Sequence, residues 1–210
     1  MTLKWLPNAL TIGRCILAIV VGYTILDFNR NVRGGDSAAL MAFLPFALFS
    51  FVALTDWLDG WLARKLNAES AFGARLDPIG DKLLSASSLL ALSFIENWAW
   101  YITVPTLAIV SRDVLITAMR EAMGNPGTMK VSNSAKMKTA LVLGGIALVL
   151  LGMAISAITS GADTYSPNWV LSRGTHLAGL IMVWVAAVLA VMTAFDYVKG
   201  LTASEEDLHQ

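Results

Sequence analysis

The chain has 210 residues, of which 56% are hydrophobic and only 14% charged, and its formal net charge at pH 7 is zero. Soluble domains carry about a quarter charged residues, so this composition predicts a membrane protein, and the lack of a basic excess gives no support for a nucleic-acid binder. One cysteine and two histidines are too few for a Cys-based or His-rich metal centre. Any metal would therefore be held by carboxylates, which favour hard cations such as magnesium or manganese.

Apolar stretches recur along the whole chain, and crossing a bilayer takes roughly 20 helical residues each time. The sequence predicts an all-α, polytopic membrane protein in which residues 1–210 form a single domain with six transmembrane helices. Trp98, Trp100 and Tyr101, between the third and fourth stretches, are typical of a membrane interface. The predicted spans are residues 7–28, 38–60, 82–102, 103–122, 137–158 and 175–198.

The basic residues orient these spans. With the N-terminus in the cytoplasm, an even number of crossings returns the C-terminus there as well. Of the 15 basic residues, only Arg30, Arg33 and Arg173 then lie on the outer side. This distribution follows the positive-inside rule, so it predicts that both termini are cytoplasmic.

Residues 56–82, DWLDGWLARKLNAESAFGARLDPIGDK, concentrate charge at the cytoplasmic ends of the second and third spans. Asp56 and Asp59 are three residues apart, and Asp77 and Asp81 are four apart, so each pair lies on one face of a helix. Two helices could thus bring four carboxylates together. Such a cluster requires protons or divalent cations to relieve its repulsion, and carboxylate sites of this kind commonly also hold substrate phosphates.

Some of these residues, taken singly, have a structural interpretation. Asp77 and Pro78 could simply cap and start a helix, and Arg64, Lys65 and Arg75 could serve only the positive-inside bias. Acidic residues at the end of a span are rare and are generally functional. The four acids at helix-face spacing therefore favour a site.

The spacing of eight positions resembles, without departure, the signature of the CDP-alcohol phosphatidyltransferases. The predicted six-span pattern is similar as well, so the resemblance covers essentially the whole chain, and it implies a homodimer. Gly145 and Gly152 predict close helix packing, and a dimer contact at this stretch stays open. The matching positions read Asp56-x2-Asp59-Gly60-x2-Ala63-Arg64-x8-Gly73-x3-Asp77-x3-Asp81.

The resemblance implies a role for each matched position. Asp56, Asp59 and Asp77 would be ligands of magnesium or manganese. Asp81 would complete the metal site and act as, or assist, the general base on the incoming hydroxyl. An alcohol would attack the lipid-bearing phosphorus of CDP-diacylglycerol, and CMP would leave. The implied CDP pocket consists of Asp56, Gly60, Ala63, Arg64 and Gly73.

Four cations in the fourth and fifth spans bear on the acceptor alcohol. Arg112 and Arg120 are eight residues apart and so lie nearly on one helix face, and Lys136 and Lys138 begin the fifth span. Together they suggest an anionic acceptor, most simply a phosphate. Positive-inside bias explains Lys130 and Lys138 well. It explains Arg112 poorly, because Arg112 lies in apolar sequence with only Asp113 as a local partner.

These segments, with the opening PNALTIGR, resemble the bacterial phosphatidylglycerophosphate synthases, a branch of the family. Asp113 stands where that branch usually has glutamate, and Ala135 where it usually has glycine. The resemblance implies glycerol 3-phosphate as the acceptor, at the cytoplasmic face of a bacterial inner membrane. Its phosphate would be bound by Arg112, Arg120, Lys136 and Lys138.

Other acceptors stay open. A phosphatidylinositol-phosphate synthase also needs cations for a phosphorylated acceptor, and a cardiolipin synthase of the same signature would use phosphatidylglycerol. A cation or proton transporter could carry acids within its spans, but transporter sites lie near mid-membrane. The acids of this chain gather instead at one membrane face.

Overall fold

The computed structural model describes the backbone of residues 6–33, 39–66, 73–122, 133–159 and 166–208. Side chains are described for residues 12–28, 41–55, 82–119, 137–159 and 166–195. Within these ranges the chain is helical apart from short turns and contains no strand, as predicted.

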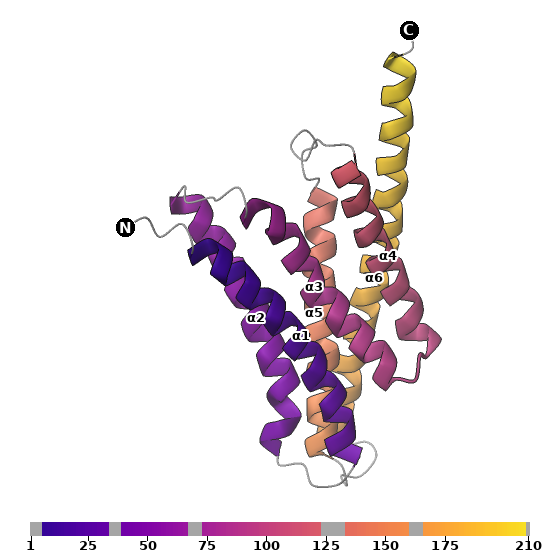
Figure 1. The fold of residues 1–210 in the computed structure, drawn as a ribbon. Coiled ribbons are helices and arrows are strands. Elements are labelled where there is room, and N and C mark those ends of the chain that lie inside the picture. Colours follow the sequence, from indigo (N-terminus) through magenta and orange to yellow (C-terminus); the bar gives the residue numbers. More distant parts are fainter. Residues whose placement is uncertain (1–5, 34–38, 67–72, 123–132, 160–165, 209–210) are drawn as a thin grey trace.

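In the described parts of the chain, six helices follow one another and form an elongated bundle (Figure 1). The first turns of α1 and the last turns of α6 lie toward the same end of the bundle, as do the end of α2 and the start of α3 (Figure 1). The helices are α1 (Leu6–Arg33), α2 (Ala39–Leu66), α3 (Gly73–Ile95), α4 (Trp100–Ala122), α5 (Asn133–Ile158) and α6 (Pro167–Leu208).

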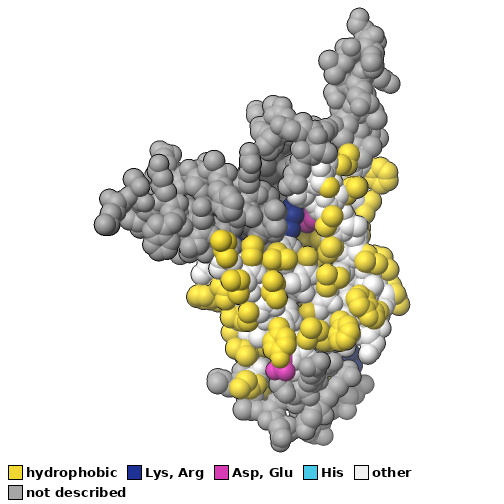
Figure 2. Space-filling model, in the orientation of Figure 1, with side chains coloured by type: hydrophobic (Ala, Val, Ile, Leu, Met, Phe, Trp, Pro, Cys, Tyr) yellow, Lys and Arg dark blue, Asp and Glu magenta, His cyan; other side chains and the backbone are white. Residues whose placement is uncertain are grey.

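The outer surface of the bundle carries an apolar band, with charged side chains at its two edges (Figure 2). Among the described residues, three stretches are long and apolar enough to cross a membrane: Trp100–Met119, Met137–Ile158 and Pro167–Phe195. Two shorter apolar stretches lie in α2 and α3, at Met41–Thr55 and Lys82–Ile95. The structure is thus that of a membrane protein, and the crossing of the membrane by all six helices stays a prediction.

The chain reverses between α3 and α4 within residues 96–101, the interface segment predicted to separate the third and fourth spans. Helix α3 ends at Ile95 and α4 begins at Trp100, whereas the predicted span limits were residues 102 and 103. Asn97 and Trp98 adopt positive φ values of 51° and 57°. Two consecutive residues in this left-handed region end a helix, a change that hydrophobicity alone does not reveal.

Glycines bring α5 and α6 into close contact. A Cβ on Gly179 would lie only 2.7 Å from the Gly145 carbonyl oxygen, and one on Gly152 would lie 2.8 Å from the His176 backbone nitrogen. Ser172 Oγ also donates to the Gly152 carbonyl at 2.9 Å. The close packing predicted from Gly145 and Gly152 is therefore confirmed, and these contacts lie within the chain.

Hydrogen bonds connect α4 to α3 and to α6. Ser93 Oγ in α3 donates to Thr106 Oγ1 in α4 at 3.1 Å, and Trp184 Nε1 in α6 donates to the Tyr101 carbonyl at 2.8 Å. These bonds fix α4 between α3 and α6. The surrounding apolar core includes Val21, Ile25, Phe49, Val52, Leu89, Leu92, Ile102, Ile109, Ile146 and Val183.

Candidate active site

The carboxylate motif occupies the end of α2 and the start of α3. Asp56 and Asp59 lie in α2, whereas Asp77 and Asp81 lie in α3, so each pair is carried by a continuous helix at the spacing of one face. Both stretches lie at the same end of the bundle (Figure 1). The motif side chains are outside the described residues, so their assembly into one cluster stays a prediction. The same holds for Gly60, Ala63 and Arg64 in α2 and for Gly73, the first residue of α3.

The predicted metal site consists only of these aspartates. No group of three His, Cys, Asp or Glu side chains within the described ranges could hold a metal ion. Carboxylate oxygens from two adjoining helices form the donor set that magnesium and manganese prefer. The chemistry of the motif therefore fits the predicted metal.

A buried ion cluster centred on Asp113 joins α4 to α5. Asp113 Oδ1 accepts hydrogen bonds from Arg112 Nη1 at 3.0 Å and from Lys138 Nζ at 2.5 Å. Asp113 is 8% exposed and Lys138 only 5%, so water screens their attraction weakly. The structure thus brings together Arg112 and Lys138, two of the four cations predicted to bind the acceptor phosphate.

Arg112 also reaches α6. Its Nη2 donates to Thr193 Oγ1 at 3.1 Å, and this hydroxyl donates in turn to the Leu189 carbonyl at 2.8 Å. Arg112 Nε is buried and has no hydrogen-bond partner among the described residues. Within that part of the chain, the guanidinium retains a donor for a further oxygen atom.

Lys82 is another cation of this cluster, although it has no role in the sequence-based interpretation. Its Nζ donates to the Asp113 carbonyl at 3.3 Å and to the Thr117 hydroxyl, and Thr117 Oγ1 donates to the same carbonyl at 2.7 Å. Lys82 directly follows Asp81, the last aspartate of the motif. Its partners are 31 and 35 residues away in sequence, so no local pattern could have revealed them.

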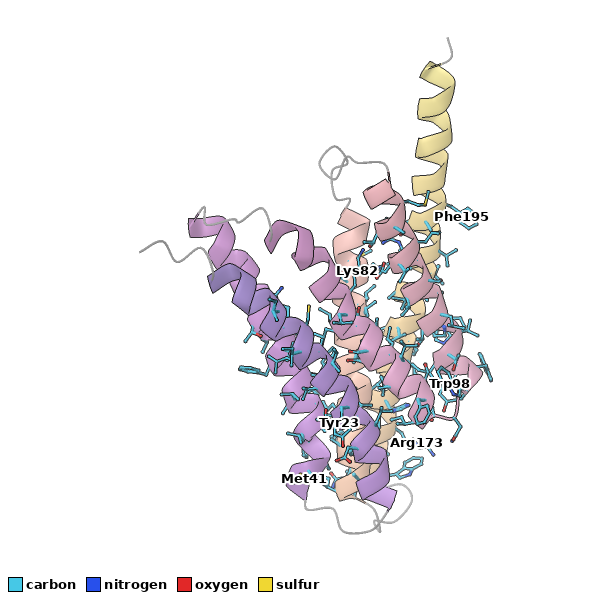
Figure 3. The ribbon with its side chains drawn as sticks, in the orientation of Figure 1. Tyr23, Met41, Lys82, Trp98, Arg173 and Phe195 are labelled. Atoms are coloured by element: carbon cyan, nitrogen blue, oxygen red, sulfur yellow. The ribbon has the colours of Figure 1, made fainter. Side chains whose placement is uncertain are left out.

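The position of Lys82 connects the two halves of the candidate site. Lys82 lies toward the same end of the bundle as Phe195, with Trp98 and Arg173 toward the other end (Figure 3). Basic and acidic side chains appear together at the upper edge of the apolar band (Figure 2). Because Lys82 is adjacent to Asp81 in the chain, the Asp113 cluster lies beside the carboxylate motif.

Among the described side chains, the cations of this cluster outnumber its acids. Arg112 and Lys138 share the carboxylate of Asp113, and Lys82 donates to the backbone carbonyl of the same residue. A phosphate monoester carries about −1.5 to −2 charges near pH 7, and cations in poorly hydrated surroundings bind such groups through charge-assisted hydrogen bonds. The described part of the site can therefore bind a phosphorylated molecule.

The other two predicted acceptor cations are placed by backbone alone. Arg120 lies in α4, about 12 Å along the helix axis from Arg112, at a rise of ~1.5 Å per residue. Lys136 lies in α5, two residues before Lys138, and side chains at this spacing project from different sides of a helix. The side chains of Arg120 and Lys136 are outside the described residues, so their part in the site stays a prediction.

The sequence profile of the CDP-alcohol phosphatidyltransferases matches residues 4–192. The chain belongs to this family. It is also similar to proteins named CDP-diacylglycerol–glycerol-3-phosphate 3-phosphatidyltransferase. The protein of this name from Escherichia coli (strain K12) is 32% identical, over 97% of this chain and 96% of its own length. Those from Cereibacter sphaeroides and Shigella flexneri serotype 5b are 30% and 31% identical, over 94% and 97% of this chain and 96% of each relative.

The match confirms the predicted family, and the matched range includes the eight spaced positions from Asp56 to Asp81, whose individual roles stay predictions. In this phosphatidyltransferase, α2 and α3 carry the signature, whereas α4 and α5 carry the cation cluster beside it. The signature is local in sequence and could be found without a structure. The contact between Lys82 and α4 joins distant segments and required one.

Proposed function

We propose that this CDP-alcohol phosphatidyltransferase transfers the phosphatidyl group of CDP-diacylglycerol to sn-glycerol 3-phosphate. The products are phosphatidylglycerophosphate and CMP. The observation that carries the choice of acceptor is the buried cluster in which Arg112 and Lys138 share Asp113 beside the carboxylate motif. Its excess of positive charge suits an acceptor that carries a phosphate. The names of the similar proteins, which align over nearly the whole chain, support the same reaction.

The donor half of the proposed site lies on α2 and α3. The CDP moiety occupies a pocket whose small residues let the nucleotide approach the backbone, while Arg64 contacts a phosphate. A bound magnesium or manganese ion would neutralise negative charge on the diphosphate and on the departing CMP. The proposed metal ligands are Asp56, Asp59, Asp77 and Asp81, and the proposed CDP pocket comprises Asp56, Gly60, Ala63, Arg64 and Gly73.

The acceptor half lies on α4 and α5. There Arg112 and Lys138, with Arg120 and Lys136, bind the phosphate of glycerol 3-phosphate and orient its free primary hydroxyl. Asp81 takes the proton of that hydroxyl as its oxygen bonds to the lipid-bearing phosphorus. The bond from this phosphorus to the bridging oxygen of the diphosphate breaks, and CMP leaves with the electron pair.

The proposed setting is the inner membrane of a bacterium, with the site at the cytoplasmic face. The positive-inside distribution supports this orientation, and a site at the interface lets a water-soluble acceptor meet a donor whose acyl chains stay in the bilayer. We further propose that the protein works as a homodimer, which the family resemblance supports.

The proposed reaction is tested with the purified protein in detergent micelles. CDP-diacylglycerol and magnesium or manganese are supplied with glycerol 3-phosphate, an inositol phosphate, serine or phosphatidylglycerol, and CMP release is measured. We expect release that requires both the metal and glycerol 3-phosphate. Release only with an inositol phosphate would identify a phosphatidylinositol-phosphate synthase, and release only with phosphatidylglycerol would identify a cardiolipin synthase. Either result would contradict glycerol 3-phosphate as the acceptor. No release with any acceptor would overturn the proposed reaction itself.

A further inference from the structure

Lys82 connects α3, which carries two aspartates of the motif, to α4 at the level of the Asp113 cluster. It is the first residue of α3 whose side chain is described, and its Nζ donates to two groups of α4, the Asp113 carbonyl and the Thr117 hydroxyl. A lysine at the end of an apolar helix is costly unless its ammonium group is satisfied by polar partners. Both partners lie within one turn of α4, so they fix Lys82 to a single place on that helix.

Asp113 receives contacts from two other helices, α3 and α5. Its backbone carbonyl accepts from Lys82 in α3, while its carboxylate accepts from Lys138 in α5. A shift of α3 along α4 would therefore break the Lys82 contacts at the same residue that holds the acceptor cations. Through this one residue, the position of α3 is coupled to the position of the cluster.

The same contact determines where Asp81 lies. Asp81 and Lys82 are consecutive, so their Cα atoms are about 3.8 Å apart and cannot move independently within a helix. A hydroxyl that attacks phosphorus must approach within roughly 3–3.5 Å in the correct orientation. An error of about 1 Å between donor and acceptor can reduce the rate a hundredfold.

We propose that Lys82 is a positioning residue of the transfer reaction, because it sets the distance between the donor bound on α2 and α3 and the acceptor bound on α4 and α5. It acts through the Asp113 carbonyl and the Thr117 hydroxyl. This role presupposes the proposed reaction and adds to it a residue outside the family signature. If Lys82 contributed only its positive charge, any nearby cation could replace it. The positioning role instead requires its two contacts with α4.

The experiment separates catalytic rate from substrate binding. In Lys82→Met, kcat should fall by about ten- to a hundredfold, because the two halves lose their alignment. The KM values for CDP-diacylglycerol should stay within about threefold, since the α2 and α3 residues that bind the donor are unchanged. Lys82→Arg, which can still donate to both oxygens, should recover part of the lost rate.

A second pair of variants tests the contact without changing any charge. Thr117→Val should lower kcat about fivefold, the usual effect of one lost hydrogen bond, while Thr117→Ser should retain the wild-type rate. Because both act through one contact, Lys82→Met combined with Thr117→Val should be no slower than Lys82→Met alone. Thr175→Val is the matched control, since the Thr175 hydroxyl donates to its own helix at Leu171 in the same way, far from the cluster.

The outcomes are distinguishable. A wild-type protein that releases no CMP would overturn the proposed reaction, whatever the variants do. An active wild type with an unchanged kcat in Lys82→Met would overturn only the positioning role. If Lys82→Met does not fold, as judged by size-exclusion chromatography in detergent, the Thr117 pair decides. Equal rates for Thr117→Val and Thr117→Ser would then reject the role of Lys82.

Discussion

Lys138 Nζ lies 2.5 Å from Asp113 Oδ1, and both residues are buried where α5 meets α4. The same carboxylate oxygen accepts a hydrogen bond from Arg112 Nη1 at 3.0 Å. One oxygen atom therefore compensates two cations that the acceptor phosphate would also attract. We therefore expect Asp113 to stabilise the cluster and Lys138 to contribute to binding of the acceptor phosphate.

Removal of the Asp113 carboxylate should destabilise the protein. In Asp113→Ala, Arg112 and Lys138 would remain buried without their counter-charge, and breaking a buried pair in this way costs about 3–5 kcal/mol. The free energy of unfolding would be measured by denaturant titration in detergent micelles. Glycerol 3-phosphate should restore more stability to this variant than to the wild type, because its phosphate can replace the missing carboxylate.

The matched control for this variant is Asp113→Glu, which retains the charge on a side chain one methylene longer. We expect it to lose much less stability than Asp113→Ala. Equal stability of the alanine variant and the wild type would contradict the role of Asp113 as the counter-charge of the cluster.

Substitution of Lys138 should weaken acceptor binding specifically. Lys138→Met keeps the apolar stem but removes a charged donor, and a hydrogen bond to a charged group contributes about 1.5–3 kcal/mol. The value of kcat/KM for glycerol 3-phosphate should fall roughly ten- to a hundredfold. The KM for CDP-diacylglycerol, measured at saturating glycerol 3-phosphate, should change little.

Lys130→Met is the control for Lys138→Met. Positive-inside bias suffices to explain Lys130, so its loss should leave the kinetics of both substrates unchanged. If the two variants behaved alike, the acceptor phosphate would not be bound by Lys138.

The all-α architecture was predictable because apolar residues repeat in stretches of membrane-spanning length. The helix borders were less predictable. Residues 96–101 were predicted to separate the third and fourth spans, but only the positive φ values of Asn97 and Trp98 show at which residues the helix ends. Close helix packing at Gly145 and Gly152 was predictable, because glycines let two helices approach each other. Which helix packs against Gly145 and Gly152 depends on the tertiary arrangement.

In the candidate site, too, local features were predictable and contacts between distant segments were not. Its signature has fixed local spacing, so Asp56 to Asp81 could be identified from the sequence alone. The pairing of Arg112 with Asp113 was also visible, because the two are neighbours in sequence. Lys82 and Thr193 were not predictable as partners of α4, since their contacts join residues 31 to 81 positions apart.

Loss of the proposed general base should abolish most turnover. In Asp81→Asn, the asparagine is nearly the same size as aspartate but can neither accept the hydroxyl proton nor supply a negative charge. A general base of this kind contributes about 10²–10⁴ in rate. At saturating magnesium, the rate of CMP release should fall by at least about a hundredfold. Asp207→Asn, in the last turn of α6, is the control and should keep full activity. Near-normal turnover in Asp81→Asn would contradict the proposed role of this carboxylate.

Close packing of α5 against α6 should make Gly179 intolerant of any side chain. In Gly179→Ala the new Cβ would lie 2.7 Å from the Gly145 carbonyl oxygen and from the Val149 backbone nitrogen, so the helices must move apart. Overpacking of this kind costs about 1–3 kcal/mol, measured as unfolding free energy in detergent. Gly174→Ala lies on the same helix with nothing within 4 Å of its Cβ, so it should be neutral or slightly stabilising. Equal stability of the two variants would mean that α5 and α6 can separate at this contact without cost.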